Sequence, residues 1–219
     1  MFNFLDFVDD LVPRAGALNM AIDEILLQNC RAPVLRAYRW DAPSTSFGYF
    51  EKYETVRAAY AHSVAVRRWT GGGIVAHGED FTFSLMVPRT DAFAKIRPQD
   101  SYRSIHQCLV RALGDYGVNA SLHVASSENR SGACFQNPVP DDLMHSGEKI
   151  AGGAQRRTSK GLLHQGSIQS LDLDRDFGAC LAQKFAIEVS SRAITPDEAS
   201  AAEQLAVRKY ATPEWLRKF

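Results

Sequence analysis

Apolar residues in the first third of the chain are spaced as one helix followed by short strands. Within residues 16–29, Leu18, Ile22 and Ile25 fall on one side of a helix, so we expect an amphipathic helix lying on a sheet. The residues after Pro33 alternate between two faces, and the next extended segment follows one turn later, which predicts a hairpin. The elements expected here are a helix at 16–29, strands at 34–40 and 45–49, a short helix at 54–61 and a strand at 64–67.

The remainder of the chain alternates between strand and helix patterns. Phe81, Phe83 and Leu85 share one face of a strand, whereas Thr82 and Ser84 share the other. The further elements expected are two strands joined by a loop over 71–88, a helix at 99–116, a strand at 120–124, a loop at 125–132, strands at 142–145, 149–155 and 162–170, and helices at 177–185, after the capping box 195–198 and from 212.

The composition gives the molecule no overall electrical bias. Across 219 residues, 25 Lys and Arg balance 25 Asp and Glu, so no global field favours nucleic acid or an anionic membrane. The N-terminus lacks the basic start and apolar core of a signal peptide, and no later run approaches the ~20 apolar residues of a membrane span. We expect one soluble, cytoplasmic domain over residues 1–219, with no nucleic-acid or membrane partner.

The four cysteines form no C-x-x-C pair and show no zinc-ligand spacing. This pattern fits a reducing compartment and argues against a disulfide framework and against a metal site. Cys108 and Cys180 lie on or beside the apolar faces of expected helices and should belong to the core. Cys134 follows a polar stretch rich in glycine and serine, and its role has to be considered separately.

Three consecutive glycines, Gly71, Gly72 and Gly73, follow a pair of arginines that includes Arg68. Neither a helix nor a strand favours such a run, because each glycine loses much backbone freedom on ordering and packs no side chain. Exposed amide N–H groups beside cations suit a phosphate or a carboxylate. The alternative is an ordinary glycine-rich hairpin turn, and the segment alone does not decide between the two.

A second glycine-rich segment, residues 147–157 (GEKIAGGAQRR), carries Lys149 on an expected strand. A lysine placed among apolar and glycine positions can direct a fixed cation at a developing oxyanion or phosphate. The alternative is a solvated strand lysine, followed by a solvated strand end from Gln155. His164 comes after two leucines, and a lone histidine there is more often a packed core residue.

Together these segments resemble the biotin/lipoate protein ligase superfamily, in its lipoate-protein ligase A and octanoyltransferase branch. The resemblance covers about residues 16–170, and the paired motifs are specific as a set. The matching segments, in order, are 19–24 (NMAIDE), 36–49 (RAYRWDAPSTSFGY), 67–73 (RRWTGGG) with His77, 147–155 (GEKIAGGAQ) and 164–166 (HQG).

The resemblance implies an α+β fold similar to the catalytic domains of class II aminoacyl-tRNA synthetases and biotin ligases. The fold would have a mixed, largely antiparallel sheet with helices on its outer face and an acyl tunnel lined by these motifs. Arg68 and the glycine loop would hold the activated carboxyl end, and Lys149 would contact its carbonyl or phosphate. The other residues implied to bind substrate are Thr70, Gly71, Gly72, Gly73, His77, Gly152, Gly153, Ala154, Gln155 and His164.

Two chemistries occur in this branch, and Cys134 separates them. Ligases activate lipoate with ATP, whereas cysteine-type octanoyltransferases hold the acyl group as a thioester. In the second group a Cys-Phe pair precedes the lysine motif by some fifteen residues, and Cys134-Phe135 followed by Lys149 matches this placement. A thiolate beside a lysine cation would be activated for attack on a thioester. The alternative for Cys134 is an inert, buried cysteine.

We therefore expect an acyltransferase that moves an octanoyl or lipoyl group to a lysine of a lipoyl-carrier domain, with Cys134 and Lys149 as catalytic residues. The carrier would be a 2-oxoacid dehydrogenase E2 or a glycine cleavage H-type protein, and acyl carrier protein is a further expected partner. Transfer needs no cofactor. The first alternative is an ATP- and Mg-dependent lipoate ligase, and a less favoured one is a non-catalytic lipoate-binding protein.

Two features depart from the family pattern. Family members often carry an aspartate directly after the histidine, whereas Gly78-Glu79-Asp80 follows His77 here, so this loop is expected to be rebuilt. The sequence also ends soon after Trp215, without the C-terminal accessory domain of single-chain ligases. That absence favours transfer over ligation, although a ligase with a separate accessory subunit remains an alternative.

Overall fold

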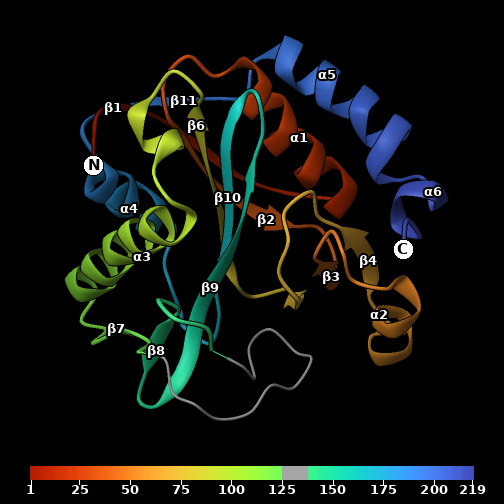
Figure 1. Cartoon of the computed structure of the whole chain (residues 1–219), viewed down its shortest axis with the longest axis horizontal. Coiled ribbons are helices and arrows are strands. Elements are labelled where there is room, and N and C mark those ends of the chain that lie inside the picture. The colour runs from red at the N-terminus through yellow and green to blue at the C-terminus, as the bar shows by residue number, and fades with distance from the viewer. Residues whose placement is uncertain (125–137) are drawn as a thin grey trace.

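The computed structural model describes residues 1–124 and 138–219, and within them most strands form one large mixed sheet (Figure 1). Described strands pair in the order β11-β1-β2-β6-β10-β9-β8-β7. Their bounds are β11 Ala186–Arg192, β1 Phe2–Arg14, β2 Val34–Trp40, β6 Phe81–Pro88, β10 Gly161–Ile168, β9 Glu148–Arg157, β8 Leu143–His145 and β7 Ser121–Leu122.

Only the pairs that include β1 are parallel among the described strands of this sheet. β1 runs parallel to both β11 and β2, whereas the pairs from β2 through β6, β10, β9 and β8 to β7 are antiparallel. The central strands β6 and β10 are buried along their whole lengths because helices cover both sides. The predicted α+β fold with a mixed, largely antiparallel sheet is therefore confirmed.

Helices cover both faces of the sheet, beyond the one outer face that we expected. On one face, α3 (Pro98–Asp115) and α4 (Phe177–Phe185) pack on residues such as Phe83 and Leu85. On the other face lies α1 (Gly16–Asn29), which α5 (Pro196–Leu205) covers in turn. Because α1 lies between the sheet and α5, it is buried on most sides, and it is not the one-sided amphipathic helix that we predicted.

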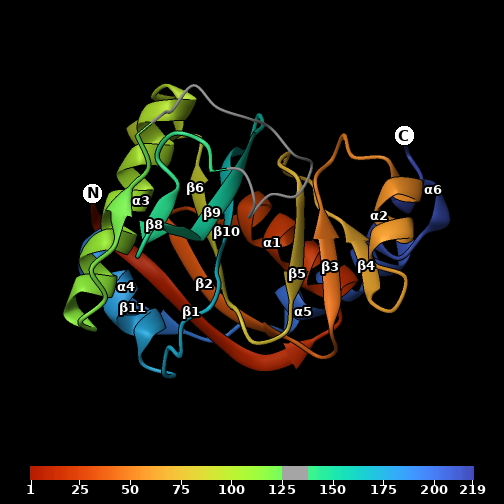
Figure 2. The same ribbon diagram turned by 90° about the horizontal axis from the view of Figure 1, so that it is seen from below.

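A second sheet of described strands carries the glycine-rich segment. β3 (Ser44–Phe47) pairs in parallel with β4 (Val64–Arg67) and antiparallel with β5 (Ile74–His77). These strands lie beside α2 (Tyr53–Ala59) and away from α3 and α4 (Figure 2). The predicted hairpin of β2 and β3 is wrong. Both edges of β2 are already paired, with β1 and β6, so the chain leaves the large sheet after Trp40.

Among the other predictions for helices, strands and cysteines, some are confirmed and some are wrong. The capping box at Thr195 and Glu198 is present at the start of α5, and a short helix, α6 (Pro213–Leu216), follows. Cys108 is buried as predicted, whereas Cys180 lies half-buried at the edge of the core. We predicted neither β1 nor β11, because the buried positions of β1 do not alternate regularly. The predicted loop at 125–132 lies outside the described residues.

No helix in the described ranges is both long enough and apolar enough to cross a lipid bilayer.

Candidate active site

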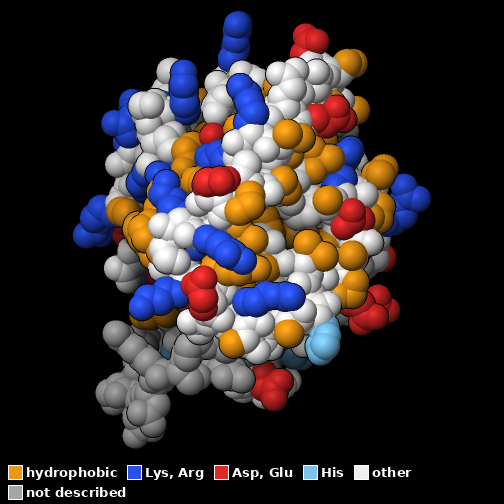
Figure 3. All heavy atoms as spheres, turned by 90° about the vertical axis from the view of Figure 1, so that its right-hand side faces the viewer, with side chains coloured by type: hydrophobic (Ala, Val, Ile, Leu, Met, Phe, Trp, Pro, Cys, Tyr) orange, Lys and Arg blue, Asp and Glu red, His pale blue; other side chains and the backbone are white. Residues whose placement is uncertain are grey.

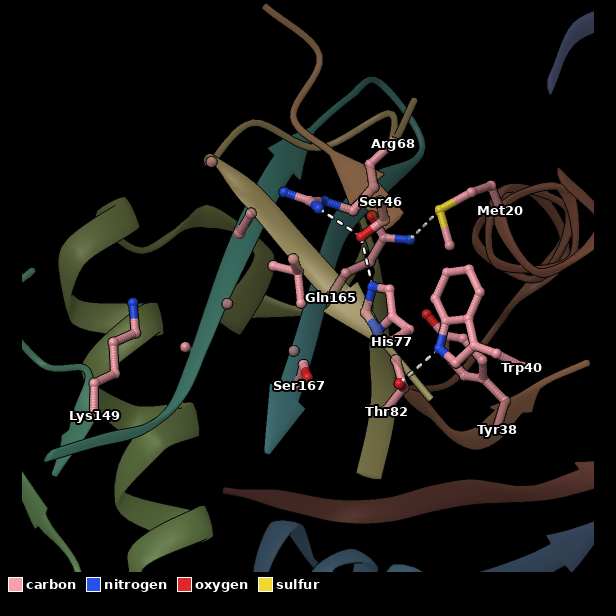
Figure 4. Close-up of a pocket in the computed structure, with 16 residues that line it drawn as sticks. Met20, Tyr38, Trp40, Ser46, Arg68, His77, Thr82, Lys149, Gln165 and Ser167 are labelled. Atoms are coloured by element: carbon pink, nitrogen blue, oxygen red, sulfur yellow. Dashed lines mark hydrogen bonds between the residues drawn. The ribbon is translucent and has the colours of Figure 1, made fainter. Parts of the chain in front are cut away.

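A cavity lies between the glycine-rich segment, β9 and β10, with about 450 Å³ of empty space that is partly open to solvent (Figure 4). Part of its wall is apolar and aromatic, from Met20 on α1, Tyr38 and Trp40 on β2, and Val75 on β5. The polar side chains in its wall are Ser46, Arg68, His77, Thr82, Lys149, Gln165 and Ser167. An apolar space with a few polar groups suits a ligand that has an apolar chain and a polar end.

The glycine loop is held in place by close backbone contacts. Gly72 has a φ of +82°, in the left-handed region that favours glycine. A Cβ atom on Gly48 would lie 1.8 Å from the carbonyl oxygen of Gly72, so these two backbone segments can only touch because Gly48 has no side chain. Among the described residues, none accepts a hydrogen bond from the backbone N–H groups of Gly71, Gly72 or Gly73. These donors therefore remain available to an anionic or carbonyl oxygen.

Arg68 fixes the same loop from inside the cavity. Its Nη2 donates to the carbonyl oxygens of Gly71 and Gly73, at 3.1 and 2.9 Å, and its Nη1 donates to Ser46 Oγ at 2.7 Å. The residue is buried, with 6% of its surface exposed. A guanidinium held by three hydrogen bonds is a rigid positive charge. That it holds the carboxyl end of a ligand, as the resemblance implies, stays a prediction.

His77 is the centre of a buried hydrogen-bond chain in the cavity wall. Its Nδ1 lies 2.7 Å from Asp80 Oδ2, its Nε2 lies 2.6 Å from Ser46 Oγ, and its ring stacks on Trp40 with centroids 4.0 Å apart. Burial lowers the pKa of His77, and the adjacent Asp80 carboxylate opposes this shift only in part. The imidazole is therefore neutral near pH 7.

Asp80 remains ionised although it is buried. Burial alone would raise its pKa, but hydrogen bonds from His77, Ser167 and the Gly78 N–H lower the pKa to about 2. The loop after His77 was expected to be rebuilt, and Asp80 is the residue that supplies the carboxylate there. The signal was present in the sequence as an acid three residues after the histidine.

Lys149 faces the cavity from β9, on the side opposite Arg68 and His77 (Figure 4). Its Nζ lies 2.7 Å from Asp142 Oδ2, and only 3% of the lysine side chain is exposed. Tyr102 on α3 donates to the other Asp142 oxygen at 2.5 Å. The alternative interpretation as a solvated strand lysine is wrong. Gly152 provides the space, because a Cβ there would lie 2.9 Å from the lysine Cε.

Gln165 on β10 is a cavity residue that the sequence analysis did not select. Its amide nitrogen donates to Asp23 Oδ2 at 2.8 Å, and its amide oxygen accepts from Thr70 Oγ1 at 2.7 Å. Asp23 is in turn paired with Arg36, at 2.8 Å. This buried network joins residues of the segments 19–24 and 36–49 to Thr70 in the glycine motif. Thr70 itself is buried behind the wall, and it supports Gln165.

The other predicted substrate-binding residues are divided between two hollows. Gly72, Gly152, Gly153 and Ala154 line the main cavity. Gly71 and Gln155 instead line a neighbouring groove that shares Gly72, Gly153 and Ala154 with the cavity and is bounded by Tyr102. Gly73 lines neither hollow, and its carbonyl oxygen accepts a hydrogen bond from Arg68.

His164 points away from the cavity, toward α3. Its ring lies 5.6 Å from Tyr102 and 5.5 Å from His106, between ring centroids, and it is fully buried. Burial holds the pKa of His164 well below its usual value. The ring fits only because residue 153 is glycine, since a Cβ there would lie 2.5 Å from His164 Nε2.

Cys134 lies outside the described residues, so its position relative to Lys149 and the cavity stays a prediction. Within residues 1–124 and 138–219, no group of three His, Cys, Asp or Glu side chains is arranged to hold a metal ion.

A comparison with known families agrees with the motifs in this cavity. Residues 15–206 match the model of the lipoyl protein ligase A/B catalytic domain. The chain belongs to this family. The match includes both glycine-rich segments and the strands β6, β9 and β10, so every described residue in the cavity wall falls within the lipoyl protein ligase domain.

Curated relatives of the chain are octanoyltransferases. LipM of Oceanobacillus iheyensis is 35% identical over 165 residues, which are 71% of this chain and 60% of the relative. LipM of Halalkalibacterium halodurans is 34% identical over 191 residues, or 80% of this chain and 67% of the relative. The chain thus spans three fifths to two thirds of the length of these relatives.

Solved structures with the same fold include lipoate ligases. The T. acidophilum protein Ta0514 with bound lipoic acid has a TM-score of 0.77 and 22% identity, with full coverage of both chains. A lipoate-protein ligase A bound with ATP has a TM-score of 0.76 and 22% identity, and 99% of each chain is covered. At this identity the likeness establishes the lipoate ligase fold.

Proposed function

We propose that this protein is an acyltransferase of protein lipoylation, which moves an octanoyl or lipoyl group to a lysine of a lipoyl-carrier domain through a thioester on Cys134. The observation that supports this most directly is the identity with LipM octanoyltransferases, combined with the spacing from Cys134-Phe135 to Lys149. The described cavity supports the proposal, because it combines an apolar wall with polar and cationic side chains such as Arg68 and Lys149.

The described residues have distinct parts in this proposal. The apolar wall around Met20 and Trp40 holds the acyl chain, and burial of its methylene groups contributes about 0.8 kcal/mol each. Arg68 and the backbone N–H groups of the glycine loop receive the carbonyl end. Lys149, kept in place by Asp142, supplies a second positive charge across the cavity.

The transfer proceeds in two steps that use only the cysteine and the two partner proteins. The Cys134 thiol gives up its proton as its sulfur attacks the carbonyl carbon of the donor, a new C–S bond forms, and the donor's leaving group departs with that proton as its own bond to the carbonyl carbon breaks. The amine of the acceptor lysine then attacks the Cys134 thioester. Its C–N bond forms, the C–S bond breaks, and the amine proton returns to the thiol, so that the enzyme is restored.

The partners follow from this chemistry. The donor is an octanoyl acyl carrier protein or an acylated carrier domain, and the acceptor is a lipoyl-carrier domain of the 2-oxoacid dehydrogenase E2 or glycine cleavage H type. No cofactor enters either step. We place the reaction in the cytoplasm.

The proposal is tested by intact-mass analysis after incubation with octanoyl acyl carrier protein. We expect one octanoyl group on the chain, absent from the Cys134→Ala variant and removed when a lipoyl domain is added. The matched control is Cys180→Ala, which changes a half-buried cysteine far from the cavity and should leave the adduct in place. An adduct that survives Cys134→Ala would refute the thioester.

A parallel incubation with lipoate and ATP separates the alternatives. Pyrophosphate release that depends on lipoate would instead make the protein an ATP-dependent ligase. Ligand binding with neither adduct nor pyrophosphate would make it a binding protein.

A further inference from the structure

The hydrogen-bond chain around His77 has only one possible direction. The Asp80 carboxylate is ionised and can only accept, so His77 Nδ1 must donate to it across the 2.7 Å contact. A neutral imidazole that donates from Nδ1 accepts at Nε2. The Ser46 hydroxyl therefore donates its proton to His77 Nε2 across 2.6 Å.

Arg68 completes this assignment at the serine. A guanidinium can only donate, so Ser46 Oγ accepts from Arg68 Nη1 at 2.7 Å. The serine oxygen thus has its proton directed at a neutral base and one lone pair directed at a fixed cation. Both effects stabilise an alkoxide more than a hydroxyl, which is how hydroxyl nucleophiles are activated.

The environment of this serine is a ligand cavity. Ser46, His77 and Arg68 all line the wall, and Figure 4 shows their side chains converging at one end of it. Gly72 also lines the cavity, and its backbone N–H has no partner among the described residues. A carbonyl placed there would meet a nucleophilic oxygen, with the Gly72 N–H as a donor for its oxyanion.

Several hydrogen bonds fix the Asp80 carboxylate, so the contacts among Ser46, His77 and Asp80 form an ordered network. Thr82 Oγ1 and Ser167 Oγ donate to the carboxylate at 2.8 and 2.7 Å, in addition to His77. Trp40 stacks on the imidazole and donates from its Nε1 to Thr82 at 2.9 Å. The imidazole is therefore fixed in both its plane and its tautomer, as general-base catalysis requires.

We infer that Ser46, His77 and Asp80 form a second acyl-transfer centre, which gives the cavity an esterase and thioesterase activity independent of Cys134. Ser46 Oγ attacks the carbonyl carbon, its proton passes to His77 Nε2, and the leaving thiol or alcohol takes that proton as its bond to carbon breaks. Water then attacks the Ser46 ester in the same way, and it releases a carboxylic acid and restores the serine. The acyl specificity of this centre rests on the function proposed above.

Labelling of the unmodified protein tests this without any substitution. A fluorophosphonate probe reacts with activated serines, and peptide mapping by mass spectrometry should place the adduct on Ser46. Octanoyl p-nitrophenyl ester is the second probe. The Cys134→Ala variant should continue to hydrolyse it, and adding Ser46→Ala should lower that rate by about 100-fold or more.

Ser44→Ala is the matched control, because Ser44 lies on the same strand, is equally buried, and its hydroxyl donates to the Ala42 carbonyl oxygen. It should change neither labelling nor hydrolysis. No adduct on Ser46, or hydrolysis unchanged by Ser46→Ala, overturns this inference. Labelling at Ser46 without an octanoyl adduct on Cys134 refutes only the proposed transferase, and the reverse result refutes only the serine centre.

Discussion

Two polar groups in the cavity wall are each held by one buried carboxylate. Asp80 fixes the tautomer of His77, and Asp142 holds the buried ammonium of Lys149. The sequence motifs selected His77 and Lys149 only through their resemblance to the family. They were not sufficient to select Ser46, whose contact with His77 joins residues 31 positions apart. Such pairings depend on the sheet register.

Asp80 should make the protein sensitive to acid. Its pKa falls from 3.8 to about 2 on folding, so it stabilises the folded state above pH 4, and this contribution is lost as the pH falls toward 2. The contribution is roughly 2 kcal/mol. We expect Asp80→Asn to flatten the decline in the free energy of unfolding between pH 5 and pH 2, measured by urea titration.

The exposed acid Asp197, in the first turn of α5, provides the comparison. Asp197→Asn should leave the acid-dependent decline unchanged. A wild-type slope retained in Asp80→Asn would show that other groups cause the acid sensitivity.

Replacing one member of the Lys149–Asp142 ion pair should destabilise the folded protein more than would be expected from the effect of replacing both. Asp142→Asn removes the carboxylate that contacts the buried ammonium of Lys149, which costs about 3–5 kcal/mol of unfolding free energy. Adding Lys149→Met removes that charge, so the double variant should be less unstable than the two single changes added together. The coupling, measured by a double-mutant cycle in urea, should be roughly 0.5–3 kcal/mol.

The surface pair of Arg97 and Asp100 shows the contrast. Asp100→Asn should leave the free energy of unfolding nearly unchanged, because water screens an exposed pair. Additive effects in the Lys149 cycle would mean that the buried ion pair contributes nothing.

At the scale of elements, local sequence patterns predicted most helices and strands, but they did not predict which strands pair with each other. The helix α1 and the strands β2 and β4 have the predicted bounds. The prediction that β2 and β3 form a hairpin was wrong, because a turn in the sequence does not show whether an edge of the preceding strand is free to pair. Both edges of β2 are already paired, with β1 and β6. β1 was missed, since its burial depends on two parallel neighbours distant in sequence.

The close contact between Gly48, which follows β3, and the glycine loop should not accommodate a side chain at Gly48. A Cβ there would lie 1.8 Å from the Gly72 carbonyl oxygen, so Gly48→Ala must displace the loop. We expect a loss of about 1–3 kcal/mol in unfolding free energy and a sharp fall in acyl adduct formation. Gly71→Ala is the control for stability, because a Cβ at Gly71 meets nothing within 4 Å. Equal stability of the two variants would contradict this account.

Across the whole molecule, Arg67 connects the second sheet to the last residues of the chain. Its guanidinium donates to the carbonyl oxygens of Trp215 and Leu216 on one side and of Tyr49 and Glu51 on the other. The surrounding face, which carries α2, α5 and α6, mixes basic and apolar side chains (Figure 3). Lys209, for example, lies 4.4 Å from the centre of the Trp215 ring.

Arg67→Lys should therefore loosen the C-terminal segment while the large sheet remains intact. Lysine carries a single ammonium and cannot donate in the planar fork of a guanidinium. We expect faster hydrogen exchange at residues 212–219 by mass spectrometry, with exchange in α3 unchanged. Uniform acceleration across the protein would instead indicate global destabilisation, and no change would mean that α6 is held by its apolar contacts alone.

The parallel position of β1 between β2 and β11 affects how the chain folds while it is being synthesised. β1 can pair with β2 once both strands have emerged from the ribosome, but its other edge stays open until Ala186–Arg192 emerges. During that interval the nascent chain presents an unpaired strand to solvent, and such an edge is prone to intermolecular pairing. The sheet is thus completed only after β11 has emerged, well after β1 and β2, and chaperones that shield nascent strands should raise the yield of folded protein.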